Sequence, residues 1–162
     1  MKLNSTSGGL DQFNTQPFMF NKEILMSSSF TPELKNRLEW SLFSLRLGVF
    51  IVFIMWTLDK FFNPGHTAKV FEIFYGISGS SATAVYIMGA LQLLLVLAFM
   101  AGVKKRISYG LILLMHAGST FSSFSRYIDG FNNLLFFAAW PMLAACLALY
   151  LLRDLDVKYT IK

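Results

Sequence analysis

The stretch Glu39–Phe62 (EWSLFSLRLGVFIVFIMWTLDKFF) constrains this chain most, because an apolar run of membrane-spanning length contains an arginine, Arg46. A charged side chain inside a bilayer raises the free energy unless it is partnered or reaches the interface. Asp59 and Lys60 close the far end of the run. Any account of this protein must therefore explain what neutralises or solvates Arg46.

The rest of the chain is built from similar runs. Of its 162 residues 55% are hydrophobic and only 14% are charged, whereas a soluble domain carries about 25% charged residues. Uncharged runs of about 18 residues or more can cross a hydrocarbon core of about 30 Å as helices. We expect four spans, at about 40–62, 81–103, 107–126 and 131–152. Backbone groups in lipid must be satisfied within the segment, and the runs lack the alternation of a barrel. The predicted fold is an all-α integral membrane protein, a four-transmembrane-helix bundle.

The spans form a predicted membrane domain, 31–154, between two tails. Residues 1–30 are polar with scattered aromatic side chains, which predicts a flexible cytoplasmic tail that is also a candidate docking segment. Residues 155–162 are expected to form a short cytoplasmic C-terminal tail. Between spans one and two, Thr67–Ile77 places apolar residues at helical spacing, which favours a short amphipathic helix on the outer membrane surface.

The net charge of +5 follows membrane orientation and does not indicate nucleic-acid binding. Most basic residues precede span one, separate spans two and three, or follow span four: Lys2, Lys22, Lys35, Arg37, Lys104, Lys105, Arg106, Arg153, Lys158 and Lys162. The positive-inside rule then places both termini in the cytoplasm. We expect a multi-pass protein of the bacterial inner (cytoplasmic) membrane, whose partners are the lipid bilayer and other membrane subunits.

Polar residues inside the predicted spans are the candidates for a ligand site. Arg46 lies roughly 9 Å from the cytoplasmic side, His116 roughly 15 Å and Gln92 roughly 18 Å. If these faces converge, the three side chains form a small polar cluster inside the bundle. Tyr109 and Thr120 share a helix face with His116, and we expect this stripe to face protein rather than lipid.

Two interpretations of the cluster stay open. In the structural one, Arg46 extends its side chain to the interface and His116 hydrogen-bonds a neighbouring helix. In the other, the cluster binds a polar headgroup or a quinone carbonyl. A metal site is not expected, because His66 and His116 are the only histidines, lie at different depths and have no carboxylate or thiol spaced to join them. No nucleophile with an adjacent base is present, so no catalytic residue is predicted.

Span one and its exit read LRLGVFIVFIMWTLDKFFNP, with Arg-x-Gly, an apolar run, a Lys-aromatic pair and a nearby proline. Those positions are Arg46, Gly48, Lys60, Phe61 and Pro64. The pattern resembles the first helix of the DoxX family, bacterial membrane proteins that include DoxX-like and DoxD-type members. The stretch GALQLLLVLAFMAGVKKRISYG is similar to the family's second helix, which often carries a glutamate near the position of Gln92. The neutral amide here removes one possible acidic partner for Arg46.

The resemblance covers about residues 40–152 and implies a four-helix membrane bundle. Some members of that family are linked to quinone-reducing thiosulfate oxidation or to membrane oxidoreductase complexes. Three functions follow as hypotheses. The first is an accessory or structural subunit of a bacterial membrane complex, redox-associated and not catalytic on its own. The second is a quinone- or lipid-binding component that uses Arg46, Gln92 and His116. The third is a small transporter, which the lack of intramembrane carboxylates disfavours. Without such a carboxylate, Arg46 is expected to reach the interface, backbone carbonyls or a group supplied from outside the chain.

Overall fold

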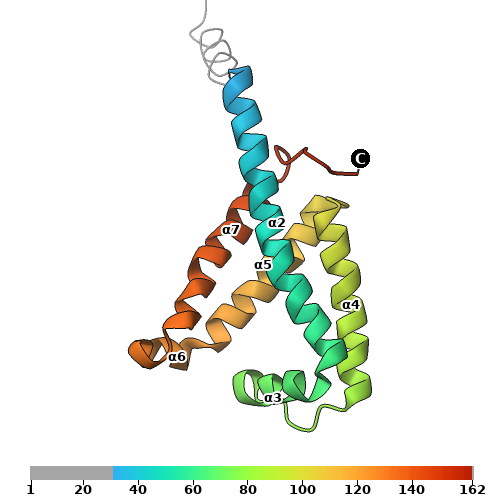
Figure 1. The fold of residues 1–162 in the computed structure, drawn as a ribbon, viewed down its shortest axis with the longest axis vertical. Helices are drawn as coiled ribbons and strands as arrows, with labels where there is room; N and C mark the ends of the chain where they lie inside the picture. The colour runs from blue at the N-terminus through green and yellow to red at the C-terminus, as the bar shows by residue number, and fades with distance from the viewer. Residues whose placement is uncertain (1–30, 162) are drawn as a thin grey trace, which may run out of the picture. The chain divides into compact units, whose positions relative to one another are not determined.

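The computed structural model describes residues 31–161, which are mostly α-helical and contain no strand. The chain divides into two units, Met1–Lys35 and Asn36–Lys162, and the packing described below lies within the second. In chain order the elements are α2 (Pro32–Phe62), α3 (Pro64–Tyr75), α4 (Ala82–Met100), α5 (Lys105–Ser122), α6 (Phe124–Ile128), η1 (Gly130–Asn132), η2 (Leu134–Ala138) and α7 (Ala139–Leu151) (Figure 1). The docking prediction for residues 1–30 lies outside the described residues.

Three helices are long and apolar enough to cross a membrane: Pro32–Phe62, Ala82–Met100 and the continuous stretch Leu134–Leu151, which joins η2 to α7. The helix α5 is not among them. It begins with Lys105 and Arg106 and carries several hydroxyl side chains, which lower its apolar content. The expectation of an all-helical chain is therefore confirmed for residues 31–161, and three of the four predicted spans have the length and apolar composition to cross a membrane.

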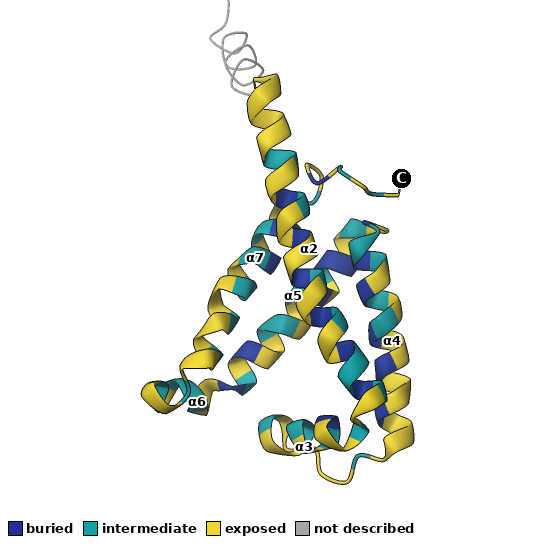
Figure 2. Ribbon diagram, viewed as in Figure 1, coloured by how far each residue is buried: buried dark blue, intermediate teal, exposed yellow. Residues whose placement is uncertain are grey.

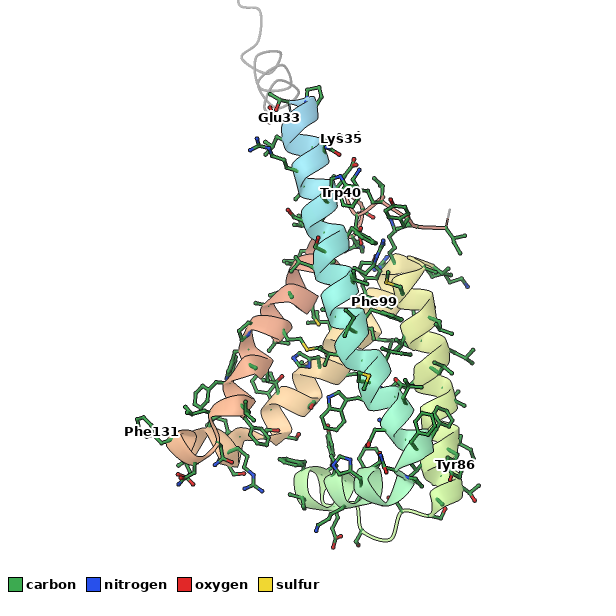
Figure 3. All side chains as sticks on the ribbon, viewed as in Figure 1. Glu33, Lys35, Trp40, Tyr86, Phe99 and Phe131 are labelled. Atoms are coloured by element: carbon green, nitrogen blue, oxygen red, sulfur yellow. The ribbon has the colours of Figure 1, made fainter. Side chains whose placement is uncertain are left out.

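The core of the second unit lies where α2, α4, α5 and α7 contribute apolar side chains to one cluster. Its buried members are Leu42, Val49, Phe53, Val96, Phe99, Tyr109, Ile112, Cys146 and Leu149. Helix α5 packs against both α4 and α7. Phe99 on α4, labelled in Figure 3, meets Tyr109 on α5 edge to face, with ring centroids 4.9 Å apart. Buried positions recur along α2, α4 and α5, whereas α7 has two buried residues, Cys146 and Leu149 (Figure 2).

Local sequence signals set the ends of the helices. Thr31 caps α2, because its hydroxyl accepts a hydrogen bond from the backbone N–H of Leu34 at 3.2 Å. The predicted short helix between spans one and two is confirmed as α3. It ends at Gly76, whose φ of 67° is left-handed and whose N–H donates to the carbonyl of Glu72 at 3.2 Å. That bond is the αL motif, in which glycine takes the left-handed position without a steric penalty.

Pro141 lies in a different context from the predicted one. The sequence suggests a continuous span four, 131–152, that Pro141 kinks from within. Instead the α-helix α7 begins at Ala139, after the 3-10 turns of η1 and η2, so Pro141 occupies its first turn. The first four N–H groups of a helix have no intrahelical acceptor, so a residue without an N–H is tolerated there.

The segment after α7, Leu152–Ile161, folds back onto the turn between α4 and α5. We call it the C-terminal segment. Its Ile161 N–H donates to the carbonyl of Ala101 at 2.8 Å. Thr160 packs so closely on Gly102 that a Cβ there would lie 2.6 Å from Thr160 Cγ2. The sequence predicts a short tail for residues 155–162. In the structure this stretch packs against the rest of the second unit as far as Ile161.

Candidate functional site

Arg46 is fully buried and lies at the centre of a polar network. Its Nη1 donates to the hydroxyl of Tyr109 at 3.1 Å and to Asp156 Oδ2 at 3.0 Å. Its Nη2 donates to the backbone carbonyl of Lys158. The Tyr109 hydroxyl donates in turn to Asp156 Oδ2 at 2.7 Å. Three elements, α2, α5 and the C-terminal segment, therefore meet in one charge-assisted network.

This network overturns one prediction. Arg46 was expected to find no carboxylate within the chain, but Asp156, with a fully buried side chain, pairs with it. The expectation that Arg46 reaches a backbone carbonyl is confirmed by the bond to Lys158. Asp156 escaped notice because it lies beyond the last predicted span and 110 residues from Arg46. The available signal was its position just after span four, on the same predicted side of the membrane as the entry to span one.

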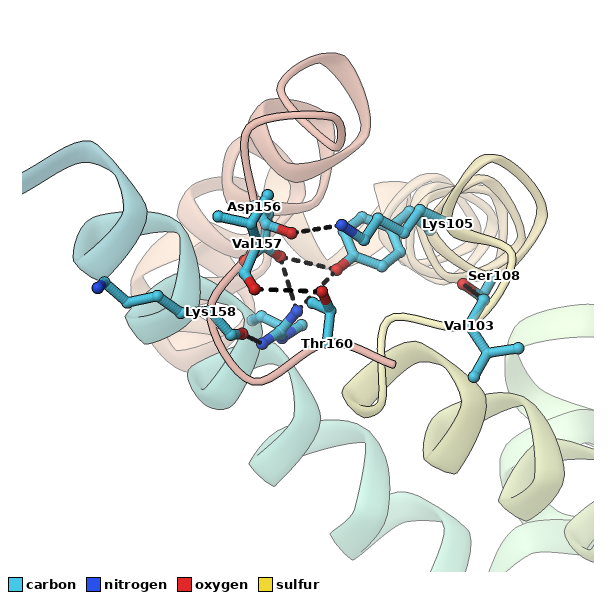
Figure 4. Close-up of polar contacts among 9 residues, drawn as sticks. Val103, Lys105, Ser108, Asp156, Val157, Lys158 and Thr160 are labelled. Carbon is cyan, nitrogen blue, oxygen red and sulfur yellow. Dashed lines mark hydrogen bonds and ion pairs between the residues drawn. The ribbon is translucent and has the colours of Figure 1, made fainter. Parts of the chain in front are cut away.

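Further contacts fasten the C-terminal segment. Lys105 Nζ donates to the backbone carbonyl of Asp156 (Figure 4). Lys158 Nζ lies 3.4 Å from Glu39 Oε2 and 4.8 Å from the centre of the Trp40 ring. These contacts are shared among α2, α5 and the C-terminal segment. The chemistry of this network is therefore structural: it neutralises Arg46 and closes one end of the helix assembly.

A cavity of about 1770 Å³ lies among α2, α3, α4, α5 and the η2–α7 stretch. Most of its lining is apolar, and it includes Val52 and Trp56 from α2, Phe71 and Phe74 from α3, and Met142 from α7. Arg46, Tyr109 and Asp156 are not part of that lining. The cavity and the Arg46 network are therefore separate features of the fold.

Two polar side chains in the cavity wall stand out because they are almost fully buried. Gln92 on α4 is 8% exposed and has no hydrogen-bond partner within residues 31–161. Lys60, in the last turn of α2, is also 8% exposed, and its Nζ donates only to the backbone carbonyl of Trp56, at 3.1 Å. Gly89, one turn before Gln92, allows α2 to approach closely, since a Cβ there would lie 3.1 Å from Lys60 Cβ.

The carboxylate next to Lys60 in the chain is engaged elsewhere. Asp59 Oδ2 lies 2.7 Å from His66 Nδ1 and accepts from the Thr67 hydroxyl at 3.2 Å. Its Oδ1 accepts from the Asn63 side-chain amide at 3.3 Å. Asp59 therefore secures the start of α3 to the end of α2. No ion pair joins Lys60 to a carboxylate in the described part of the chain.

His116 also lines the cavity but has a protein partner. Its Nε2 lies 3.0 Å from the carbonyl oxygen of Ala139, which can only accept, so Nε2 carries the proton. Its ring meets Phe53 edge to face at 6.2 Å. The prediction that His116 hydrogen-bonds a neighbouring helix is confirmed. Thr120 is buried and donates to the carbonyl of His116 at 2.8 Å, within its own helix.

The five predicted site residues thus fall into separate sets of contacts. Arg46 and Tyr109 share the network with Asp156. His116 bonds to Ala139 on α7, and Thr120 bonds to His116 within α5. Gln92 lines the cavity with no hydrogen-bond partner among residues 31–161. Sequence reasoning missed Asp156 and gave no site role to Lys60. Residues 31–161 hold no group of three or more His, Cys, Asp or Glu side chains arranged to bind a metal ion.

Comparison with known proteins adds no assignment: no family model, no curated protein and no solved structure matches this chain. The resemblance to the DoxX family therefore stays a prediction. Function has to be inferred from the cavity, its polar residues and the arrangement of the helices.

Proposed function

We propose that this protein is a four-span protein of the bacterial cytoplasmic membrane that binds a membrane amphiphile, a lipid or a quinone, in the cavity. The proposal includes α5 as the fourth crossing and both termini in the cytoplasm. It retains the DoxX-like fold as its structural frame. It assigns binding rather than catalysis, because the polar residues of the cavity wall include no nucleophile paired with a base.

Exposed apolar side chains support the membrane setting. Met55, Leu94 and Leu114 are each more than 60% exposed, and they lie on three different helices. In water such surfaces would drive association, whereas lipid tails solvate them. Exposed apolar helices therefore do not require a partner subunit, and the accessory-subunit hypothesis gains no separate support.

The contacts of the C-terminal segment favour a fourth crossing. Ile161 bonds to Ala101, so both lie on the same side of the bilayer. Only two helical stretches of spanning length, α5 and η2–α7, separate them along the chain. If η2–α7 crosses the membrane, α5 must cross it as well for the chain to return to that side. The pairing of Arg46 with Asp156 supports the same count. It places the beginning of span one and the segment after α7 on one side of the bilayer. The helices between these points, α2, α4, α5 and η2–α7, then cross an even number of times.

The cavity is the single observation that carries the binding function. Its volume of about 1770 Å³ exceeds the range of about 300–1,000 Å³ that is usual for sites of small soluble ligands. An apolar wall with a few polar groups suits a molecule with a long hydrocarbon part and a compact polar head. Lipids and isoprenoid quinones both meet that description.

The test uses a substitution that obstructs the cavity without disturbing the packing. Gly48 lies in the cavity wall on α2, and a Cβ added there meets nothing within 4 Å. Gly118 on α5 is also helical and open, but it lies outside the cavity wall. Gly48→Trp should therefore occlude the cavity, and Gly118→Trp is the matched control.

Each protein would be purified in mild detergent, and bound lipids and quinones would be counted by native mass spectrometry and solvent extraction. The wild type and Gly118→Trp should retain a stoichiometric amphiphile. Gly48→Trp should lower its occupancy by about tenfold, which corresponds to a loss of about 1.4 kcal/mol in binding. Equal occupancy in all three proteins, or none in the wild type, would refute the proposal.

A further inference from the structure

We infer that Lys60 and Gln92 form a headgroup subsite that selects an amphiphile with a single anionic oxygen group, a carboxylate or a phosphodiester. This inference rests on the proposed binding function and specifies the ligand. The subsite lies at the end of the cavity that α3 borders, where Thr67 and Phe71 also contribute to the wall.

The first observation is a buried lysine that forms no ion pair with any carboxylate among residues 31–161. Lys60 is 8% exposed and lines the cavity, and its one hydrogen bond goes to a backbone carbonyl of its own helix. An ammonium group has three N–H donors, so two remain. A buried charge is costly unless it is paired. Asp59, the nearest carboxylate in sequence, is occupied by Asn63, His66 and Thr67.

The second observation is an amide without a partner in the same wall. Gln92 is more than nine-tenths buried, lines the cavity and makes no hydrogen bond within residues 31–161. Its side chain offers two N–H donors. An unpaired buried amide is unfavourable in an apolar site, so a ligand that accepts its hydrogen bonds would be stabilised.

The close approach of α2 and α4 places Gln92 one helical turn along α4 from the position that packs on Lys60. Gly89 and Gln92 lie one turn apart on α4, and Gly89 packs directly against Lys60 and Phe61. Gly89 thus holds the end of α2 beside the turn that carries Gln92. The ammonium and the amide together supply donors and one positive charge at the edge of an apolar chamber.

This combination discriminates between headgroups. A single anionic oxygen group neutralises Lys60 and accepts from both side chains through charge-assisted bonds. A neutral quinone carbonyl can accept a hydrogen bond but leaves the charge uncompensated. A zwitterionic headgroup brings a second cation next to Lys60. The hydrocarbon chain of the ligand would extend along the apolar wall toward Met142.

The chain contains its own reporter for a binding assay. Two of its three tryptophans, Trp40 and Trp56, line the cavity. Bromine atoms quench tryptophan emission only at short range, so a brominated chain in the cavity lowers the fluorescence. The full-length protein, delipidated in neutral detergent, would be titrated with dibromostearate and with its uncharged methyl ester, at a pH where the acid is ionised.

The wild type should bind the acid at least about tenfold more tightly than the ester, the ratio expected for one charge-assisted hydrogen bond. Lys60→Met should abolish that preference, and Gln92→Leu should reduce it. Lys60→Arg should keep it. Lys69→Met, which removes the same charge from an exposed position on α3 outside the cavity wall, should behave as the wild type.

Brominated phosphatidylglycerol and phosphatidylcholine form a second pair of ligands. A preference for phosphatidylglycerol that exceeds the preference for the acid assigns the headgroup as a phosphodiester, and the reverse assigns a carboxylate. Equal binding of acid and ester by the wild type, or a preference that survives Lys60→Met, would overturn the subsite while the amphiphile site itself stands. Absence of binding by every probe would refute both proposals.

Discussion

Asp156→Asn isolates the contribution of one buried charge. The substitution preserves the size of the side chain and one oxygen that can accept from Arg46 Nη1, now 3.0 Å away, and from the Tyr109 hydroxyl, now 2.7 Å away. The negative charge is lost. Arg46 remains fully buried, so its charge is left with only neutral partners, Tyr109 and the carbonyl of Lys158.

Removing one member of a buried ion pair costs about 3–5 kcal/mol, because the other charge remains uncompensated. The lower end applies here, since the neutral hydrogen bonds of Arg46 persist. Within the described part of the chain, Asp156 Oδ1 has no hydrogen-bond partner, so an amide nitrogen in its place would add an unpaired donor. We therefore expect Asp156→Asn to lower the free energy of unfolding by about 3 kcal/mol.

The free energy of unfolding would be measured in mixed micelles by titration with a denaturing detergent, followed by tryptophan fluorescence and circular dichroism. Asp154→Asn is the matched control, because Asp154 is 85% exposed and its carboxylate lies as far as 4.0 Å from the Arg153 guanidinium. An exposed pair of that kind contributes about 0–1 kcal/mol. If Asp156→Asn differed from Asp154→Asn by less than about 1 kcal/mol, the pairing of Asp156 with Arg46 would not stabilise the fold.

Two further substitutions probe helix packing and helix ends by the same titration. Gly89→Leu should destabilise the protein by about 1–3 kcal/mol because its Cβ would press on the facing side chains of α2, whereas Gly118→Leu should have little effect. If Gly89→Leu left the free energy of unfolding unchanged, that result would contradict the close contact of α2 and α4. Pro141→Ala should destabilise by up to about 1 kcal/mol, since proline in the first turn only restricts the unfolded chain. If Pro141→Ala instead raised the free energy of unfolding by about 3 kcal/mol, Pro141 would lie inside the helix rather than in its first turn.

The helices were predictable because their signals are local. Thr31 followed by Pro32 marks the start of α2, where the structure shows the Thr31 cap. The short helix predicted over Thr67–Ile77 is present as α3, but it runs from Pro64 to Tyr75 and is capped by Gly76. Each signal depends on a backbone conformation that a few neighbouring residues determine. Apolar runs of spanning length likewise identify α2, α4 and the η2–α7 stretch without knowledge of their neighbours.

The candidate site was less predictable because depth along a helix does not fix rotation about its axis. Arg46, Gln92 and His116 are predicted at comparable depths, yet Arg46 faces Tyr109 and the C-terminal segment while Gln92 and His116 line the cavity. The helix start after η2 was equally hidden, because Pro141 suits both a kink and a first turn. Which side of each helix meets protein depends on all the others at once.

The distance along the chain between Arg46 and Asp156 has a consequence for biogenesis. If α2 spans the membrane as proposed, Arg46 enters the bilayer before its counter-ion is made, because Asp156 is encoded 110 residues later. At synthesis rates of about 5–20 residues per second, Arg46 waits roughly 5–20 s for that carboxylate. During this interval water, lipid headgroups or the insertion machinery would have to solvate the guanidinium. On the same proposal, a nascent chain that stops before Asp156 would contain all the helices of the second unit and still carry an unneutralised arginine.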